Sequence, residues 1–186
     1  MKTTLYAAIS LDGFIARADG SVDWLEAFGD PNDDVGHRAF QESVDVLVMG
    51  GKTYRQMLTF GPWPYAGKST WVYSRQPVET NPGDVLHTDA PPTELVEQLR
   101  RESKRHLWLF GGGEVNAMFL RADLIGELCL FVTPITLGTG IPLFAPPVPE
   151  RTWTLLRHAP WRQGVVELHY TANPGKRASD SIHSDP

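Results

Sequence analysis

The sequence has little cysteine, no concentrated basic segment and no long apolar run. Its 186 residues include one cysteine, Cys129, so no disulfide can form within the chain, and we expect a cytoplasmic protein. Asp and Glu outnumber Lys and Arg by 22 to 17, and no more than two basic residues are adjacent, which argues against nucleic-acid binding. Apolar runs stay well below the roughly 18 residues of a membrane-spanning helix, so no membrane association is expected.

A metal site is not predicted either. The six histidines include no pair four residues apart, and no cysteine cluster accompanies them.

What the chain does contain is an alternation of short apolar segments with amphipathic ones. Such alternation predicts an α/β fold with a mostly parallel central sheet flanked by helices, in one domain over residues 1–172. Residues 173–186 are polar, and we expect a disordered tail. The predicted strands are 4–10, 44–49, 70–74, 84–88, 106–110 and 127–135, followed by an antiparallel pair at 153–159 and 165–172. The predicted helices are 34–43, 52–59, 93–103 and 114–121.

Two glycine-rich junctions lie between a predicted strand and a helix. Gly50-Gly51-Lys52-Thr53 would form a Walker A loop only with glycine at position 46, which is Val46. It therefore indicates either a simple tight turn or a turn that binds an anion at the helix N-terminus. Gly111-Gly112-Gly113 lacks the further glycine of a dinucleotide fingerprint, because Asn116 takes that position. Three consecutive glycines favour close approach of the backbone to a ligand.

Each of the other candidate residues has both a functional and a structural interpretation. Ser74-Arg75 ends a strand where α/β sheets bind ligands, although a solvated loop arginine explains it equally simply. Asp33 and Asp34 stand at the start of the first predicted helix, where acidic residues also serve as caps. Asp12 either acts near the site or shapes the turn that it shares with Gly13.

Taken together, these segments resemble the dihydrofolate reductase-like superfamily, and above all its RibD C-terminal-domain reductases. The resemblance covers residues 3–172 and implies a three-layer fold that transfers a hydride from NADPH to a small-molecule substrate. The segments that carry it are Ile9–Ala16, Asp23–Leu25, Val48–Tyr54, Tyr73–Arg75, Phe110–Gly113 and Thr136–Phe144.

The resemblance also implies roles for individual residues. Ala8 and Ile15 would border the nicotinamide, and the loop from Asp12 to Asp30 would form a lid. Asp34 falls near the acidic residue that holds the pterin in folate reductases. The remaining contacts would be to the cofactor: phosphates at Gly51, Lys52 and Thr53, the 2′-phosphate at Ser74 and Arg75, and the pyrophosphate at Gly111, Gly112, Gly113, Glu114 and Val115.

Several positions depart from the family pattern. Gly51 replaces the usual arginine, and Lys68, Asn116 and Phe131 replace residues typical of folate reductases. We therefore expect a 5-amino-6-(5-phosphoribosylamino)uracil reductase-like enzyme acting on a heterocyclic or sugar-derived substrate. The alternatives are dihydrofolate reductase activity and a non-catalytic NADP(H)-binding module. Relatives of this kind commonly form dimers through the late strands, and the apolar segment 128–132 fits either such a homodimer or a buried central strand.

Overall fold

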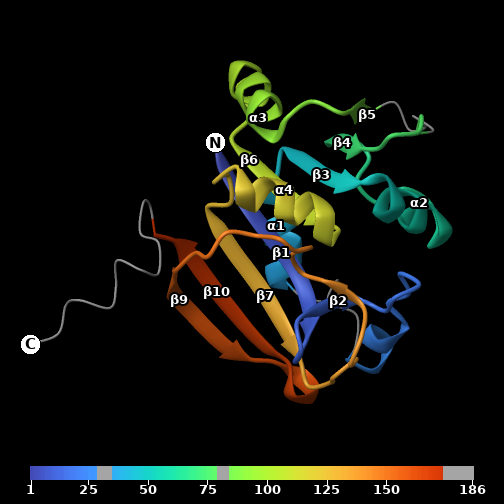
Figure 1. The fold of residues 1–186 in the computed structure, drawn as a ribbon, viewed down its shortest axis with the longest axis vertical. Coiled ribbons are helices and arrows are strands. Elements are labelled where there is room, and N and C mark those ends of the chain that lie inside the picture. Colours follow the sequence, from blue (N-terminus) through green and yellow to red (C-terminus); the bar gives the residue numbers. More distant parts are fainter. Residues whose placement is uncertain (29–34, 79–83, 174–186) are drawn as a thin grey trace, which may run out of the picture.

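A computed structural model describes residues 1–28, 35–78 and 84–173. In this part of the chain, eight strands form one mixed sheet in the order β5-β4-β3-β6-β1-β7-β10-β9 (Figure 1). Neighbouring strands pair in parallel from β5 to β7, and β10 is antiparallel to both β7 and β9. The strands are β1 Lys2–Ser10, β3 Val46–Gly50, β4 Ser69–Tyr73, β5 Val85–Thr88, β6 His106–Gly111, β7 Glu127–Thr133, β9 Trp153–Pro160 and β10 Val166–Ala172.

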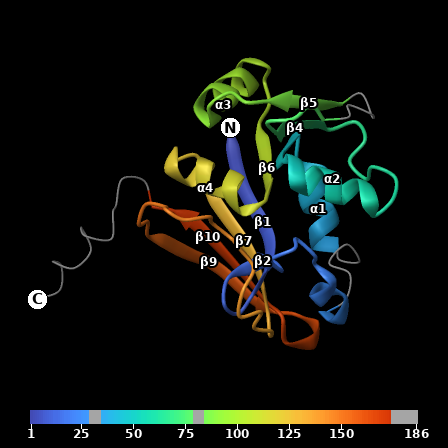
Figure 2. The same ribbon diagram turned by 45° about the vertical axis from the view of Figure 1, so that its right-hand side comes forward.

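Helices cover the two faces of the sheet in pairs. One apolar cluster joins the sheet to α3 and α4, and a second joins the opposite face to α1 and α2 (Figures 1 and 2). The predicted three-layer α/β fold with a mixed, mostly parallel sheet is therefore confirmed. The helices are α1 Val35–Ser43, α2 Gly51–Thr59, α3 Pro92–Arg101 and α4 Gly113–Arg121, with 3₁₀ turns at η1 Asp23–Phe28 and η3 Arg162–Gly164.

The continuous apolar run in β3 follows from this two-sided burial. Val46 and Val48 belong to the cluster beneath α3 and α4, whereas Leu47 and Met49 belong to the cluster beneath α1 and α2. All four are fully buried. Because successive side chains of a strand point to opposite faces, only a strand covered on both faces is apolar throughout.

Several predicted boundaries were wrong. α3 begins at Pro92 rather than after a Thr93 cap, since proline suits the first helical position, where its missing N–H costs nothing. β7 ends at Thr133, and Ser74 follows β4 instead of belonging to it. The short antiparallel pair β2 Phe14–Ala16 and β8 Ile141–Pro142 was not predicted, because such short strands have no detectable periodicity.

Some predictions lie outside the described residues. These are the candidate acids Asp33 and Asp34, the end of the expected lid at residues 29–30, and the tail from residue 174 onward.

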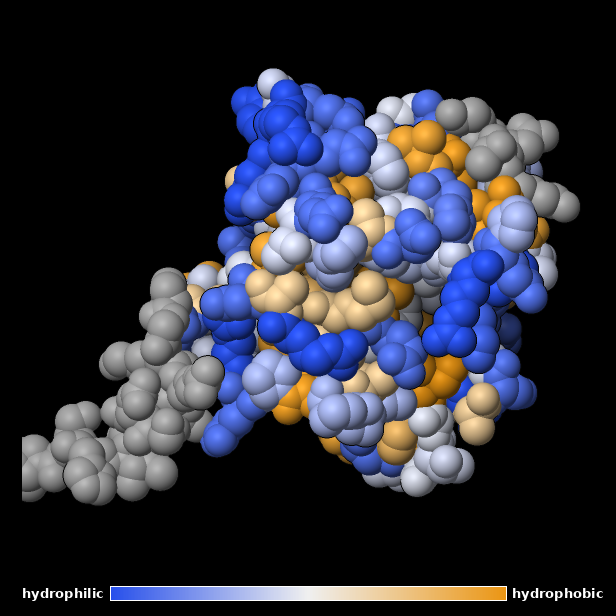
Figure 3. All heavy atoms as spheres, turned by 45° about the horizontal axis from the view of Figure 1, so that its top comes forward, coloured by the Kyte–Doolittle hydropathy of each residue, from blue (hydrophilic) through white to orange (hydrophobic). Residues whose placement is uncertain are grey.

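The surface in Figure 3 is mostly hydrophilic, with apolar side chains in separate spots between polar ones. Within the ranges described, no helix is both long and apolar enough to cross a membrane.

Candidate active site

A cavity of about 830 Å³ lies at the carboxyl ends of the parallel strands β1 and β6. This is the edge of an α/β sheet at which ligands usually bind. Five of the predicted site residues line it: Ala8, Ile15, Lys52, Thr53 and Gly112. The topology thus brings together residues that are far apart in the sequence, although their roles stay predictions.

One end of the cavity is formed by the start of α2. The helix follows directly on β3, and Gly50 precedes it without a side-chain cap, so the first backbone N–H groups of the helix keep their hydrogen-bonding capacity. Lys52 is exposed there. Thr53 Oγ1 accepts a hydrogen bond of 3.2 Å from the Gly112 N–H, which connects this helix N-terminus to that of α4. This end suits an anion, because the N-terminal ends of both helices and the side chain of Lys52 carry positive charge.

Close packing explains why glycine occupies several of these positions. A Cβ atom at Gly51 would lie 2.8 Å from Ser74 Oγ, so Ser74 fills the space of a side chain at position 51. A Cβ at Gly112 would lie 3.4 Å from Thr53 Oγ1, and one at Gly113 would overlap the carbonyl oxygen of Pro142. The two glycine junctions and the Ser74 loop are therefore direct neighbours.

The remaining predicted cofactor residues do not line the cavity with side chains. Arg75 and Glu114 are exposed, and Val115 is buried against Gly50. Gly111 is buried and has a φ of 108°, a conformation that favours glycine. The roles predicted for Gly111 to Val115 use backbone N–H groups, so the side-chain positions neither support nor oppose them.

The other end of the cavity is aromatic, and sequence reasoning missed it. The ring centroids of Tyr6 and Phe131 are 5.0 Å apart, those of Tyr6 and His37 5.2 Å, and those of Trp108 and Phe110 4.8 Å. The sequence signal that could have predicted this aromatic end is the alternation of side-chain directions along β1 and β6. Tyr6 and Ala8 share one face of β1, as Trp108 and Phe110 do in β6, and the two strands are neighbours in the sheet.

Two polar residues of the cavity wall were also missed as candidates for binding. Arg55 lies one turn after Gly51, and its Nη1 atom is 3.3 Å from where a Gly51 Cβ would be. Asn116 is 1% exposed, and its Nδ2 donates to the Leu143 carbonyl at 2.8 Å. Its Oδ1 has no hydrogen-bond partner among the described residues. A buried acceptor without a partner in a cavity wall indicates a ligand that donates a hydrogen bond.

Asp12 connects two loops beside the cavity. Its carboxylate accepts hydrogen bonds from Ser10 Oγ at 2.6 Å, from the Leu137 N–H at 3.1 Å and from the Gly138 N–H at 2.7 Å. The hydrogen bond from Ser10, followed by those from the two backbone groups, outweighs desolvation and lowers the pKa of Asp12 to about 2. The structure thus supports the turn-shaping reading of Asp12, while a catalytic role stays a prediction.

We predict that Asp12→Asn lowers the melting temperature near neutral pH, because an amide is a weaker acceptor for these donors. The pKa of Asp12 is about 2 in the folded state against an ordinary 3.8. The ionised Asp12 carboxylate therefore stabilises the folded state fully above the ordinary pKa, and this stabilisation disappears as the pH falls through about 2. Thermal unfolding at several pH values measures this; a gap between variant and wild type that stays constant down to about pH 2 contradicts it.

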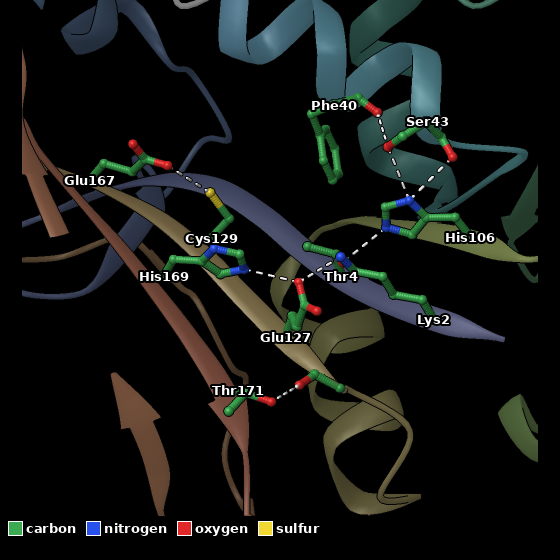
Figure 4. Close-up of polar contacts among 11 residues, drawn as sticks. Lys2, Thr4, Phe40, Ser43, His106, Glu127, Cys129, Glu167, His169 and Thr171 are labelled. Atoms are coloured by element: carbon green, nitrogen blue, oxygen red, sulfur yellow. Dashed lines mark hydrogen bonds and ion pairs between the residues drawn. The ribbon is translucent and has the colours of Figure 1, made fainter. Parts of the chain in front are cut away.

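A separate polar cluster lies on the sheet beside α1 (Figure 4). Glu127 accepts from Lys2 Nζ and from His169 Nε2, both at 2.9 Å, and Cys129 Sγ lies 3.6 Å from a carboxylate oxygen of Glu167. Burial raises the pKa of the Cys129 thiol to about 12, and the Glu167 charge adds to this, so the thiol stays protonated and is a poor nucleophile. The paired charges indicate a structural cluster. Within the described ranges, no three His, Cys, Asp or Glu side chains are placed to hold a metal ion.

We predict that Glu127→Gln destabilises the protein by about 1 kcal/mol near neutral pH, the scale of a partly exposed ion pair. Burial raises the pKa of Glu127, but the hydrogen bonds and charges of Lys2 and His169 together outweigh burial and lower it. The difference in the free energy of unfolding between wild type and variant should therefore shrink as the pH falls below about 4.5, the ordinary pKa of glutamate. Urea unfolding measures it, with Glu97→Gln on the exposed face of α3 as control; equal effects of the two substitutions contradict the prediction.

The comparisons with known proteins agree with this geometry. The family model of the RibD C-terminal domain matches residues 1–167, and the chain belongs to this family. YwjB, an uncharacterized protein of Bacillus subtilis strain 168, is 35% identical over 170 residues, which are 91% of this chain and 97% of YwjB. YyaP, also uncharacterized and from the same strain, is 28% identical over 184 residues, 92% of this chain and 95% of YyaP.

Solved structures show the same fold. A Shewanella sp. PV-4 protein whose name assigns it to riboflavin biosynthesis superposes with a TM-score of 0.84 at 31% identity, covering 93% of this chain and 99% of that one. A Thermotoga maritima diaminohydroxyphosphoribosylaminopyrimidine deaminase/5-amino-6-(5-phosphoribosylamino)uracil reductase gives a TM-score of 0.69 at 14% identity, covering 92% of this chain and 56% of that protein. The second likeness concerns the fold alone.

Proposed function

We propose that this protein is an NADPH-dependent reductase of the RibD C-terminal type, which transfers a hydride to a small heterocyclic or sugar-derived molecule. The observation that carries the proposal is the division of one cavity into two ends. Backbone amides and cations form one end at α2, and aromatic rings form the other. Ala8 and Ile15 lie in the wall of the same cavity, so a dinucleotide held at the first end can present its reactive ring to a substrate at the second.

The residues present fit NADPH. The N-terminus of α2, with Lys52 and Thr53, suits phosphates, and Gly112 keeps the adjoining backbone free of a side chain. Ser74 and Arg75 follow β4 at the same edge of the sheet, where they would hold the 2′-phosphate. The Oδ1 atom of Asn116 has no hydrogen-bond partner among the described residues, and it suits a hydrogen bond from the N–H of the nicotinamide carboxamide.

When bound, the cofactor supplies the hydride from C4 of its nicotinamide ring; placement is the protein's task. Ala8 and Ile15 present apolar surface to that ring and limit the access of water. Asp12 holds the loop after β1 to the loop at Leu137 and Gly138, which keeps Ile15 in position.

Reduction of a polar double bond also needs a proton. Asp19 is the only carboxyl group among the cavity-lining residues described, and the Ser21 N–H holds its pKa below the ordinary value, so it is ionised at neutral pH. His37 lies in the aromatic wall with Nε2 at 2.9 Å from the Gln41 side-chain nitrogen. With that amide donating, the ring proton of His37 is on Nδ1. Asp34, which the resemblance relates to the acidic residue that holds the pterin in folate reductases, lies outside the described residues.

Folate reduction is less well supported. The resemblance relates Lys68 to the arginine that binds the folate tail in folate reductases, but its Nζ donates to the Val44 carbonyl at 2.7 Å and the residue does not line the cavity. Binding of NADPH without turnover of any substrate would favour the non-catalytic module instead.

We predict that NADPH raises the melting temperature more than NADH does, and that Arg75→Ala and Gly112→Val each reduce the NADPH effect. A ligand at about 100 times its dissociation constant adds roughly 2.7 kcal/mol of stability. Arg100→Ala, at an exposed site on α3, is the control and should leave the shift unchanged. No shift with millimolar NADPH, or equal shifts in wild type and both site variants, would refute the cofactor site.

We further predict that Arg55→Ala weakens NADPH binding about tenfold, or about 1.4 kcal/mol, with a smaller effect on NADH. The reason is that the Arg55 guanidinium lies beside Gly51 and within reach of the Ser74 loop. Isothermal titration of both nucleotides measures the difference. Arg38→Ala, on the exposed face of α1, is the matched control, and equal losses for NADPH and NADH would place Arg55 away from the 2′-phosphate.

A further inference from the structure

The lysine and arginine charges of the cavity are confined to one end. Among the lining residues described, Lys52 and Arg55 are the only lysine and arginine, and both belong to the first turns of α2. The proposed cofactor phosphates need both of them. The aromatic end contributes Tyr6, His37, Tyr65, Trp108, Phe110 and Phe131.

Cations near the aromatic end are already engaged. Lys2 and Arg157 line a smaller hollow of about 320 Å³ that shares Tyr6 and Phe131 with the main cavity. Lys2 is paired with Glu127, and Arg157 with Glu167.

Among the residues that the structure describes, a phosphate group at this end would find no unpaired lysine or arginine. Proteins bind phosphates with arginine, lysine or the N-terminus of a helix, because an unpaired anion is strongly disfavoured among apolar groups. The aromatic rings instead offer flat apolar surface, and rings bind other rings by offset stacking or edge contacts. Phe131 illustrates this, since its ring centroid lies 5.0 Å from that of Tyr6 and 5.5 Å from that of Trp161.

We propose that the aromatic end accepts a planar heteroaromatic substrate without a phosphate group, either uncharged or cationic. This inference rests on the proposed reductase function and narrows its substrate class. It separates this chain from an enzyme whose substrate is a phosphoribosylamino compound, as the name of the Thermotoga maritima protein specifies.

Matched ligand pairs test the proposal. The probes are 5-amino-6-(5-phosphoribosylamino)uracil and its phosphatase product, together with FMN and riboflavin. Each is titrated into the protein saturated with NADP⁺, with tryptophan fluorescence as the readout. At least one phosphate-free member should bind, and at least as tightly as its phosphorylated partner. Tenfold tighter binding of a phosphorylated member, or no binding of either phosphate-free member at millimolar concentration, overturns the proposal.

Two variants test whether the phosphate-free ligand binds at the aromatic end. Phe131→Leu should weaken the phosphate-free ligand about tenfold and leave the NADPH dissociation constant unchanged, whereas Leu156→Ala, at an exposed position of β9, should change neither. Phe110→Leu replaces Phe131→Leu if that variant does not fold. Undiminished ligand binding in the ring variant places the ligand elsewhere and contradicts the proposal. Failure of the wild type to bind NADPH, measured separately, refutes the reductase function instead.

Discussion

The hydrogen bond from the Gly112 N–H to Thr53 Oγ1 joins the two glycine junctions on which the site depends. The partners are 59 residues apart in sequence, and they meet because β3 and β6 are adjacent parallel strands that both end at this edge. Each strand is followed at once by a helix, so two positive helix ends face the same space. Strand pairing brings the two helix N-termini to this edge, and the hydrogen bond links them directly.

The aromatic end depends on a different constraint, the uneven cover of the sheet. In β3 and β6, apolar side chains on both faces of the sheet are packed into a cluster. β9 is largely exposed. At β1 and β7, side chains such as Tyr6 and Phe131 are left between the helix-covered part and this open edge. These large rings do not completely fill the space between the helix-covered strands and the exposed edge. The space that remains is the part of the cavity proposed to take a planar substrate.

The sequence predicted much of the fold because each strand buried on both faces is a short apolar run ended by glycine or a polar residue. The same signal located the glycine junctions at 51–53 and 111–113, since their position depends only on where strands end. The aromatic wall was not predicted, because Tyr6, His37, Trp108 and Phe131 come from four elements and meet only through sheet order. Asp12 was identified, but its partners at Leu137 and Gly138 are 125 residues or more away, beyond any local pattern.

Gly51 shows how a departure from a family pattern can be compensated in space. Counting along the sequence, the change from arginine to glycine removes a cation from the start of α2. In the folded chain, Ser74 fills the volume that a side chain at 51 would need, and the guanidinium of Arg55 reaches back to the same place. Residues four apart on a helix lie on one face, so a cation at 55 can serve a site at 51 without lengthening the loop. Arg55 thus supplies positive charge near the helix N-terminus while the Ser74 loop packs directly against Gly51, and this arrangement is visible only once the two segments are placed side by side.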